Sequence, residues 1–140
     1  MKNKICNSMI LCVTIGLVYV WFGALKFFPG LSPAEQLSKN TIDQLTFGVV
    51  TDKLSIMLLA ILEVGIGLLL IFDLYRKQVV LIALAHMACT FSPLLFFPAQ
   101  SFELAPVVPT LLGQYIGKNI IIVGALVILL REDRKKMNYK

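Results

Sequence analysis

The chain has 140 residues, of which 58% are hydrophobic and only 15% are charged, and its mean hydropathy is +0.83. An ordinary soluble domain carries about 25% charged residues, so the composition excludes a typical soluble protein and indicates a membrane protein. The net charge of +5 does not indicate nucleic-acid binding, because the basic residues lie beside apolar segments, where they are typical of membrane topology signals.

Four apolar runs follow one another along the chain, at about residues 5–28, 54–72, 79–97 and 110–130. Each is close to the ~20 residues with which a helix crosses the hydrocarbon core of a bilayer. The runs predict an all-α, polytopic membrane protein in which residues 1–140 form a single domain, a bundle of four transmembrane helices. The three cysteines form no C-x-x-C pair and show no metal-binding spacing, so no metal site is predicted.

The basic residues are unevenly distributed about these spans. Most of them precede the first span, connect the second to the third, or follow the fourth: Lys2, Lys4, Arg76, Lys77, Arg131, Arg134, Lys135, Lys136 and Lys140. By the positive-inside rule, this pattern predicts that both termini are cytoplasmic and that residues 131–140 form a basic cytoplasmic tail. Contact of the tail with anionic membrane lipid is a second use of the same charges.

The connection between the first two spans is too long for a plain turn and carries its own helix start signal. Ser32-Pro33-Ala34-Glu35 has the form of a capping box with proline at the first helical position. Beyond it, Leu37, Ile42 and Leu45 fall near one face of a helix. This pattern predicts a short interfacial helix on the outer membrane surface. The alternative is an irregular polar loop.

Two further features concern the packing and the continuity of the helices. Gly16 and Gly23 lie seven residues apart on one stripe of the first span, where a neighbouring helix can approach closely. The third span meets Ser92-Pro93 before it has crossed the bilayer, so a break or kink is expected there. Four prolines and several phenylalanines between Phe91 and Pro109 predict irregular backbone that caps the outer end of the bundle.

Three ionisable side chains interrupt the spans: Glu63, His86 and Lys118. A charge at bilayer depth costs roughly 2.5 to 3.5 kcal/mol, so such residues normally face a protein interior and find partners there. At the rise of an α-helix, Glu63 lies about 13.5 Å, Lys118 about 12 Å and His86 about 16.5 Å from the outer end of its span. The three groups are therefore expected to meet in one layer.

Neighbouring polar residues extend this expected site toward the outer surface. Gln114 and Tyr115 precede Lys118 on the fourth span, and Lys26 lies at the outer end of the first. Two interpretations of the charged residues remain open. Glu63 and Lys118 either form a buried ion pair that only fixes helix register, or they also serve a ligand or a proton path. His86 is either a satisfied interior histidine or a member of the same site.

Several motifs resemble those of the DoxX-type bacterial membrane proteins. Trp21-Phe22-Gly23-Ala24-Leu25-Lys26-Phe27 is similar to the G-x-x-K-F element of that family, and Leu62-Glu63-Val64-Gly65-Ile66-Gly67 is similar to its E-x-x-x-G pattern. The segments Ser32 to Phe47 and His86 to Pro93 resemble a bacterial branch of the group. The resemblance covers nearly the whole chain, and it implies a four-helix bundle with Lys26 and Glu63 at motif positions.

The resemblance implies a protein of the bacterial inner membrane that is related to the membrane subunit of a thiosulfate:quinone oxidoreductase. From it we expect a membrane subunit or partner of a quinone-linked oxidoreductase, with no covalently bound cofactor, a diffusible quinone and a redox partner subunit. The alternative is a non-enzymatic scaffold or assembly factor. A small-molecule carrier is a third reading, and Gly113 and Gly117 form a small-x-x-x-small step that could support a homo-oligomer. Whether the chain catalyses a reaction stays open.

Overall fold

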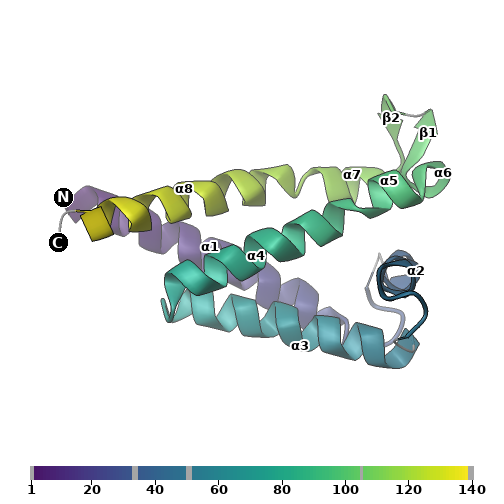
Figure 1. Cartoon of the computed structure of the whole chain (residues 1–140), viewed down its shortest axis with the longest axis horizontal. Helices are drawn as coiled ribbons and strands as arrows, with labels where there is room; N and C mark the ends of the chain where they lie inside the picture. The colour runs from purple at the N-terminus through teal and green to yellow at the C-terminus, as the bar shows by residue number, and fades with distance from the viewer. Residues whose placement is uncertain (1, 33–34, 50–51, 105, 139–140) are drawn as a thin grey trace.

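A computed structural model describes residues 2–32, 35–49, 52–104 and 106–138 of the chain, and most of these residues are helical (Figure 1). The elements are α1 (Lys2–Leu25), α2 (Glu35–Thr46), α3 (Asp52–Ile71), α4 (Arg76–Phe91), α5 (Pro93–Phe96), α6 (Pro98–Ser101), β1 (Phe102–Leu104), β2 (Val108–Pro109), α7 (Leu111–Gly117) and α8 (Ile120–Asn138). Within these residues, four helical segments are long and apolar enough to cross a membrane: Ser8–Leu25, Lys53–Ile71, Arg76–Phe96 and Leu111–Asp133. The prediction of an all-α protein with four membrane spans is confirmed to that extent.

The predicted break in the third span is confirmed. Helix α4 ends at Phe91, and Pro93 starts the short helix α5 at a position where a helix needs no N–H donor. Pro98 starts α6 in the same way. The chain then forms an antiparallel hairpin in which Leu104 lies opposite Val108, and this hairpin projects from one end of the molecule (Figure 1).

The fourth span differs from the single helix expected over residues 110–130. The side chain of Thr110 caps α7 by accepting a hydrogen bond from the Gly113 N–H over 3.1 Å. The helix is interrupted after Gly117 and resumes as α8 at Ile120. Glycine and asparagine are poor helix formers, and both flank Lys118 at this interruption. At the other end α8 continues to Asn138, so most of the predicted tail is helical.

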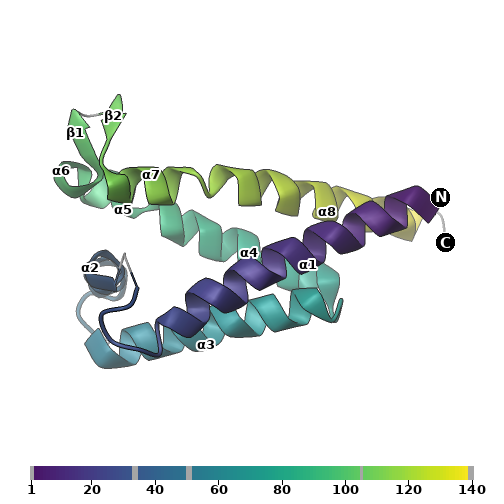
Figure 2. The ribbon, with the colours of Figure 1, turned by 180° about the vertical axis from the view of Figure 1, so that it is seen from behind.

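The most extensive helix contact joins α1 and α3, which run side by side (Figure 2). A Cβ atom placed on Gly67 would lie 2.6 Å from the Gly16 carbonyl oxygen, and one on Gly23 would lie 2.9 Å from the Glu63 Cβ. No real side chain fits at such distances, so glycine is required for this backbone approach. The close contact predicted for the stripe of Gly16 and Gly23 is confirmed.

The buried core is shared by α1, α3, α4 and α8. Its members are Cys12, Ile15, Tyr19, Ile66, Leu70, Val79, Val80, Ala83, Met87, Leu126 and Leu129. Beyond this core, at the end of the molecule near both termini, Arg76 donates to Ser8 Oγ over 2.6 Å and to Asp73 Oδ2 over 2.6 Å, and it lies 3.7 Å from Asp133 Oδ1. These contacts fasten α1, α4 and α8 together at that end.

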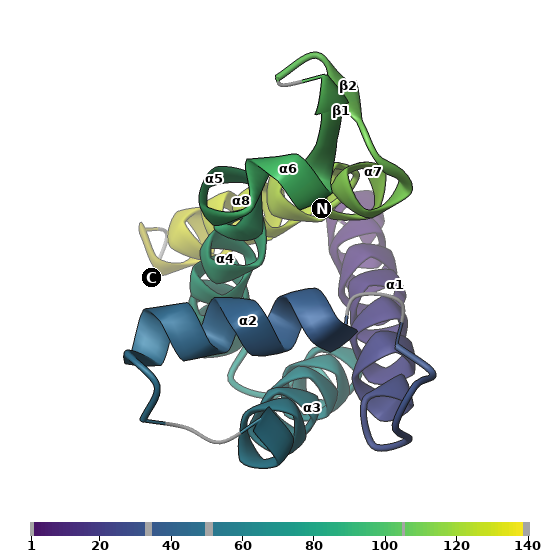
Figure 3. The same ribbon diagram turned by 90° about the vertical axis from the view of Figure 1, so that its right-hand side faces the viewer.

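Helix α2 lies across the opposite end, between α3 and α5 (Figure 3). Its Leu37 and Thr41 are buried, so the helix is confirmed and its apolar face packs against the protein. The Glu35 carboxylate accepts hydrogen bonds from the Gly30 N–H and from Lys39 Nζ, each over 2.7 Å. These bonds lower the pKa of Glu35, with Lys39 as the larger cause of the lowering. The Glu35 carboxylate therefore reaches the Gly30 N–H and not the Ser32 N–H that the predicted capping box requires, and Pro33-Ala34 of that box lie outside the described residues.

Candidate functional site: a buried polar network beside a cavity

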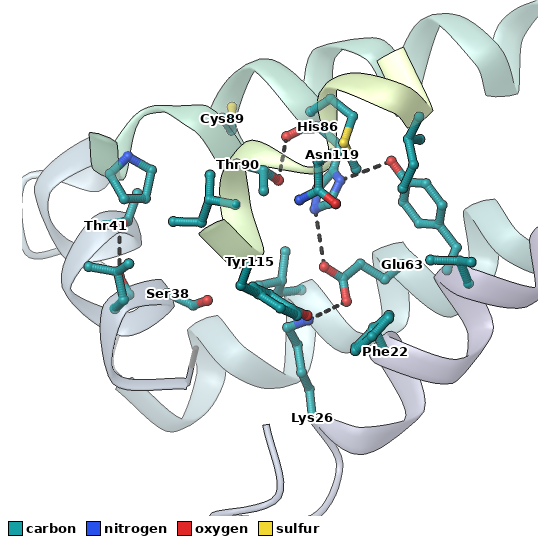
Figure 4. A pocket seen from close by; sticks show the side chains of 18 of the residues that line it. Phe22, Lys26, Ser38, Thr41, Glu63, His86, Cys89, Thr90, Tyr115 and Asn119 are labelled. Atoms are coloured by element: carbon teal, nitrogen blue, oxygen red, sulfur yellow. Dashed lines mark hydrogen bonds and ion pairs between the residues drawn. The ribbon is translucent and has the colours of Figure 1, made fainter. Parts of the chain in front are cut away.

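Glu63 is the centre of a buried polar network. Its Oε2 accepts a hydrogen bond from Lys26 Nζ over 2.5 Å, and its Oε1 lies 3.3 Å from His86 Nε2 (Figure 4). The three side chains are only 7 to 10% exposed. Glu63 lies on α3 and His86 on α4, and Lys26 directly follows the end of α1, so the network ties together three chain segments that are distant in sequence.

Tyr19 extends the network to the second ring nitrogen of His86. The Tyr19 hydroxyl lies 3.2 Å from His86 Nδ1 and 3.3 Å from the Ala83 carbonyl oxygen. Tyr19 packs within the buried core, but it was not among the residues that the sequence assigned to the site. A signal was present, because Tyr19 lies between Gly16 and Gly23 on the stripe that meets α3.

The ion pair expected between Glu63 and Lys118 is not formed, because the partner of Glu63 is Lys26. Gly23 brings α1 against α3 at Glu63 itself, and Lys26 follows Gly23 by one helical turn. Lys118 instead lies at the interruption between α7 and α8. Its Nζ is 4.7 Å from the centre of the Tyr115 ring, in a cation–π contact.

A cavity of about 450 Å³ adjoins the network. Its walls are mainly apolar, and α2 covers it with Leu37, Thr41, Ile42 and Leu45. Phe22 and Tyr115 pack edge to face in the wall, with their ring centres 5.6 Å apart. A mostly apolar cavity with a few polar groups on its wall is typical of a small-molecule binding site.

Five of the six residues that the sequence assigned to the site line this cavity: Lys26, Glu63, His86, Tyr115 and Lys118. Gln114 lies elsewhere. It is exposed, it donates to the Pro109 carbonyl over 3.4 Å, and it lines a second hollow between α7 and the hairpin. Asn119 also lines the cavity and was missed, although an amide next to a lysine within an apolar span is itself an unusual feature.

The network accommodates two arrangements of its protons without movement of heavy atoms. In the first, the Tyr19 hydroxyl donates to Nδ1 of a neutral His86, whose Nε2–H donates to Glu63. In the second, a protonated His86 donates from both nitrogens, and the Tyr19 hydroxyl turns to donate to Ala83, which lies at a similar distance. Every group has a hydrogen-bond partner in both arrangements.

No family model, curated protein or solved structure matches the chain.

Proposed function

We propose that the chain is a DoxX-like protein of the bacterial inner membrane whose cavity binds a quinone on behalf of a quinone-linked oxidoreductase partner. In this proposal the four spans form a bundle within the bilayer, both termini are cytoplasmic, and α2 lies at the outer interface. The uneven distribution of basic residues supports this orientation. The start of α1 and the end of α8 also lie at the same end of the molecule (Figure 1), as expected if both termini face the same side of the membrane.

The observation that carries the proposal is the position of the hydrogen-bonded network of Glu63, His86, Tyr19 and Lys26 in the wall of an apolar cavity. A quinone has an apolar ring with two carbonyl oxygens, so it fits a cavity with apolar walls and a few hydrogen-bond donors. Its reduction to a quinol consumes two electrons and two protons. In this proposal both electrons come from the redox partner. One proton passes to the quinone from the network of His86, Tyr19 and Glu63, the second comes from water, and water then returns a proton to the network.

Quinone binding tests this proposal directly. The purified protein in lipid nanodiscs should bind menaquinone or ubiquinone, and Glu63→Gln should weaken the binding by about tenfold, equivalent to ~1.4 kcal/mol. Glu103→Gln provides a matched control, because Glu103 is exposed on the hairpin and should bind quinone as the unmodified protein does. Equal affinity of the Glu63→Gln variant, measured on folded protein, would contradict the assigned role of Glu63.

A second candidate function is that of a non-enzymatic scaffold or assembly factor. It is favoured by one observation, namely that both oxygens of Glu63 and both nitrogens of His86 already have partners within the protein. Such a network can serve only to fix the helices. In that case Glu63→Gln lowers the thermal stability and the recovery of a partner complex, while any quinone binding stays unchanged.

A further inference from the structure

A second set of polar side chains lines the cavity from α7 and from the interruption that follows it: Tyr115, Lys118 and Asn119. Figure 4 shows Tyr115 and Asn119 on the side of the cavity that faces His86 and Glu63. Within the described part of the chain, neither the Tyr115 hydroxyl nor the Asn119 amide has a hydrogen-bond partner, and no carboxylate lies within 4.0 Å of Lys118 Nζ.

This set differs in kind from the network around Glu63. There each polar group is satisfied by another group of the protein. Here the Tyr115 hydroxyl and the Asn119 amide, both half-buried, have no hydrogen-bond partner among the described residues, and the exposed Lys118 meets the face of the Tyr115 ring. This set is therefore where a bound molecule can form polar contacts without displacing a partner within the protein.

The charges around the cavity indicate the sign of that molecule. Among the described residues that line the cavity, Glu63 is the sole acid, and it is already paired with Lys26. Lys118 adds a positive charge that no acid of the lining balances. Hydroxyl, ammonium and amide groups together supply donors that suit an oxyanion.

We propose that Tyr115, Lys118 and Asn119 form a head-group subsite for an anionic amphiphile with one apolar chain and a carboxylate or phosphate head. The head group is held at Lys118, and the chain lies against the apolar wall. The volume of about 450 Å³ suits one chain and not a two-chain phospholipid. Lys118 also lines the hollow beside the hairpin, so the head group can reach the subsite from that end of the molecule. This inference shares its cavity with the proposed quinone site, and it rests on the proposed function in no other respect.

The test compares ligands that differ only in the head group, on the full chain in nanodiscs of zwitterionic lipid. Radiolabelled palmitate and a single-chain lysophosphatidate are measured against hexadecanol. We expect at least one of the two anions to bind at least tenfold more tightly than the alcohol, because hydrogen bonds to charged groups contribute about 1.5 to 3 kcal/mol. Preference between the two anions identifies the head group as carboxylate or phosphate.

Variants then locate the subsite. Lys118→Gln should weaken binding of the preferred anion by roughly tenfold, Lys118→Arg should retain it, and Tyr115→Phe should weaken it by roughly threefold. Lys53→Gln is the control, since Lys53 is exposed on α3 and does not line the cavity. If Lys118→Gln does not fold, the relative affinity of the unmodified protein for the anions and the alcohol still tests whether the cavity prefers an anionic head group.

Equal affinity for the anions and the alcohol would overturn the inference, and so would anion binding that Lys118→Gln leaves unchanged. The two proposals fail separately. If the protein binds no quinone but still binds an anion through Lys118, the proposed function is wrong and the subsite stands. If the protein binds quinone through Glu63 but shows no preference for an anion, the proposed function stands and the subsite is wrong.

Discussion

The buried Lys26–Glu63 pair should contribute to the free energy of unfolding by an amount that follows from its geometry. The pair is 2.5 Å long, and its side chains are 7% and 10% exposed. Glu63→Gln leaves the Lys26 ammonium buried without a counter-charge, and breaking a buried pair in this way costs about 3 to 5 kcal/mol. Lys26→Met should cost less, because it removes a charge of the pair and leaves Glu63 Oε1 facing His86 Nε2 at 3.3 Å.

The double variant Lys26→Met, Glu63→Gln distinguishes this account from a simple loss of packing. It contains no unpaired charge at this position, so its free energy of unfolding should lie only about 1 kcal/mol below that of the unmodified protein. The two substitutions should therefore couple by roughly 2 kcal/mol or more. Reversible unfolding in mixed micelles titrated with SDS provides the measurement. If the two costs simply add, charge pairing is not what stabilises these helices.

Three other predictions follow from contacts elsewhere in the molecule. Gly67→Ala should destabilise the protein by about 1 to 3 kcal/mol, because the added methyl group forces α1 away from α3. Gly65→Ala lies on the same helix but has open space at its Cα, so it should stabilise the protein by up to about 1 kcal/mol. Thermal denaturation of both variants checks this, and equal shifts of their melting temperatures would refute it. Arg76→Met should lower the free energy of unfolding by about 2 kcal/mol, because it removes the contacts with Asp73, Ser8 and Asp133. The control Lys77→Met, at an exposed neighbouring residue, should change that free energy by less than about 0.5 kcal/mol in the same assay. Because the pKa of Glu35 is lowered, its carboxylate stabilises the docking of α2 at pH values above the ordinary pKa of the group, and this stabilisation is lost as the pH falls through the lowered pKa. Amide exchange in α2, corrected for intrinsic rates, should therefore accelerate in acid. Glu35→Gln should remove this pH dependence.

The spans and the membership of the site follow from the sequence because each depends on local pattern. Apolar runs fix the number of long helices, prolines fix the break at Ser92, and glycine spacing fixes the face by which α1 meets α3. Counting residues from the outer end of a span estimates depth along its axis. That estimate was enough to place Glu63 and His86 in the same layer, where they lie 3.3 Å apart.

The choice of partners could not be predicted in this way. Depth says nothing of the rotation of a helix about its axis or of which helices are neighbours, so an estimate from depth alone favoured Lys118 over Lys26 as the partner of Glu63. Lys26 was expected near the outer surface, yet its long side chain extends inward and is buried. The interruption at Lys118 depends on Gly117 and Asn119, whose weak helix propensity is overridden in many helices by tertiary contacts. The hydroxyl of Tyr19 acquires its role only when α4 places His86 beside it.

The two ends of the molecule are held by different contacts. Near the termini, a common core and the contacts of Arg76 fix the long helices. At the opposite end, α2 lies across the cavity between α3 and α5 (Figure 3), and the helices on either side of the cavity meet through the Glu63–His86 and Phe22–Tyr115 contacts. A molecule bound in the cavity should therefore slow amide exchange in α2 and α7 and leave the C-terminal half of α8 unaffected.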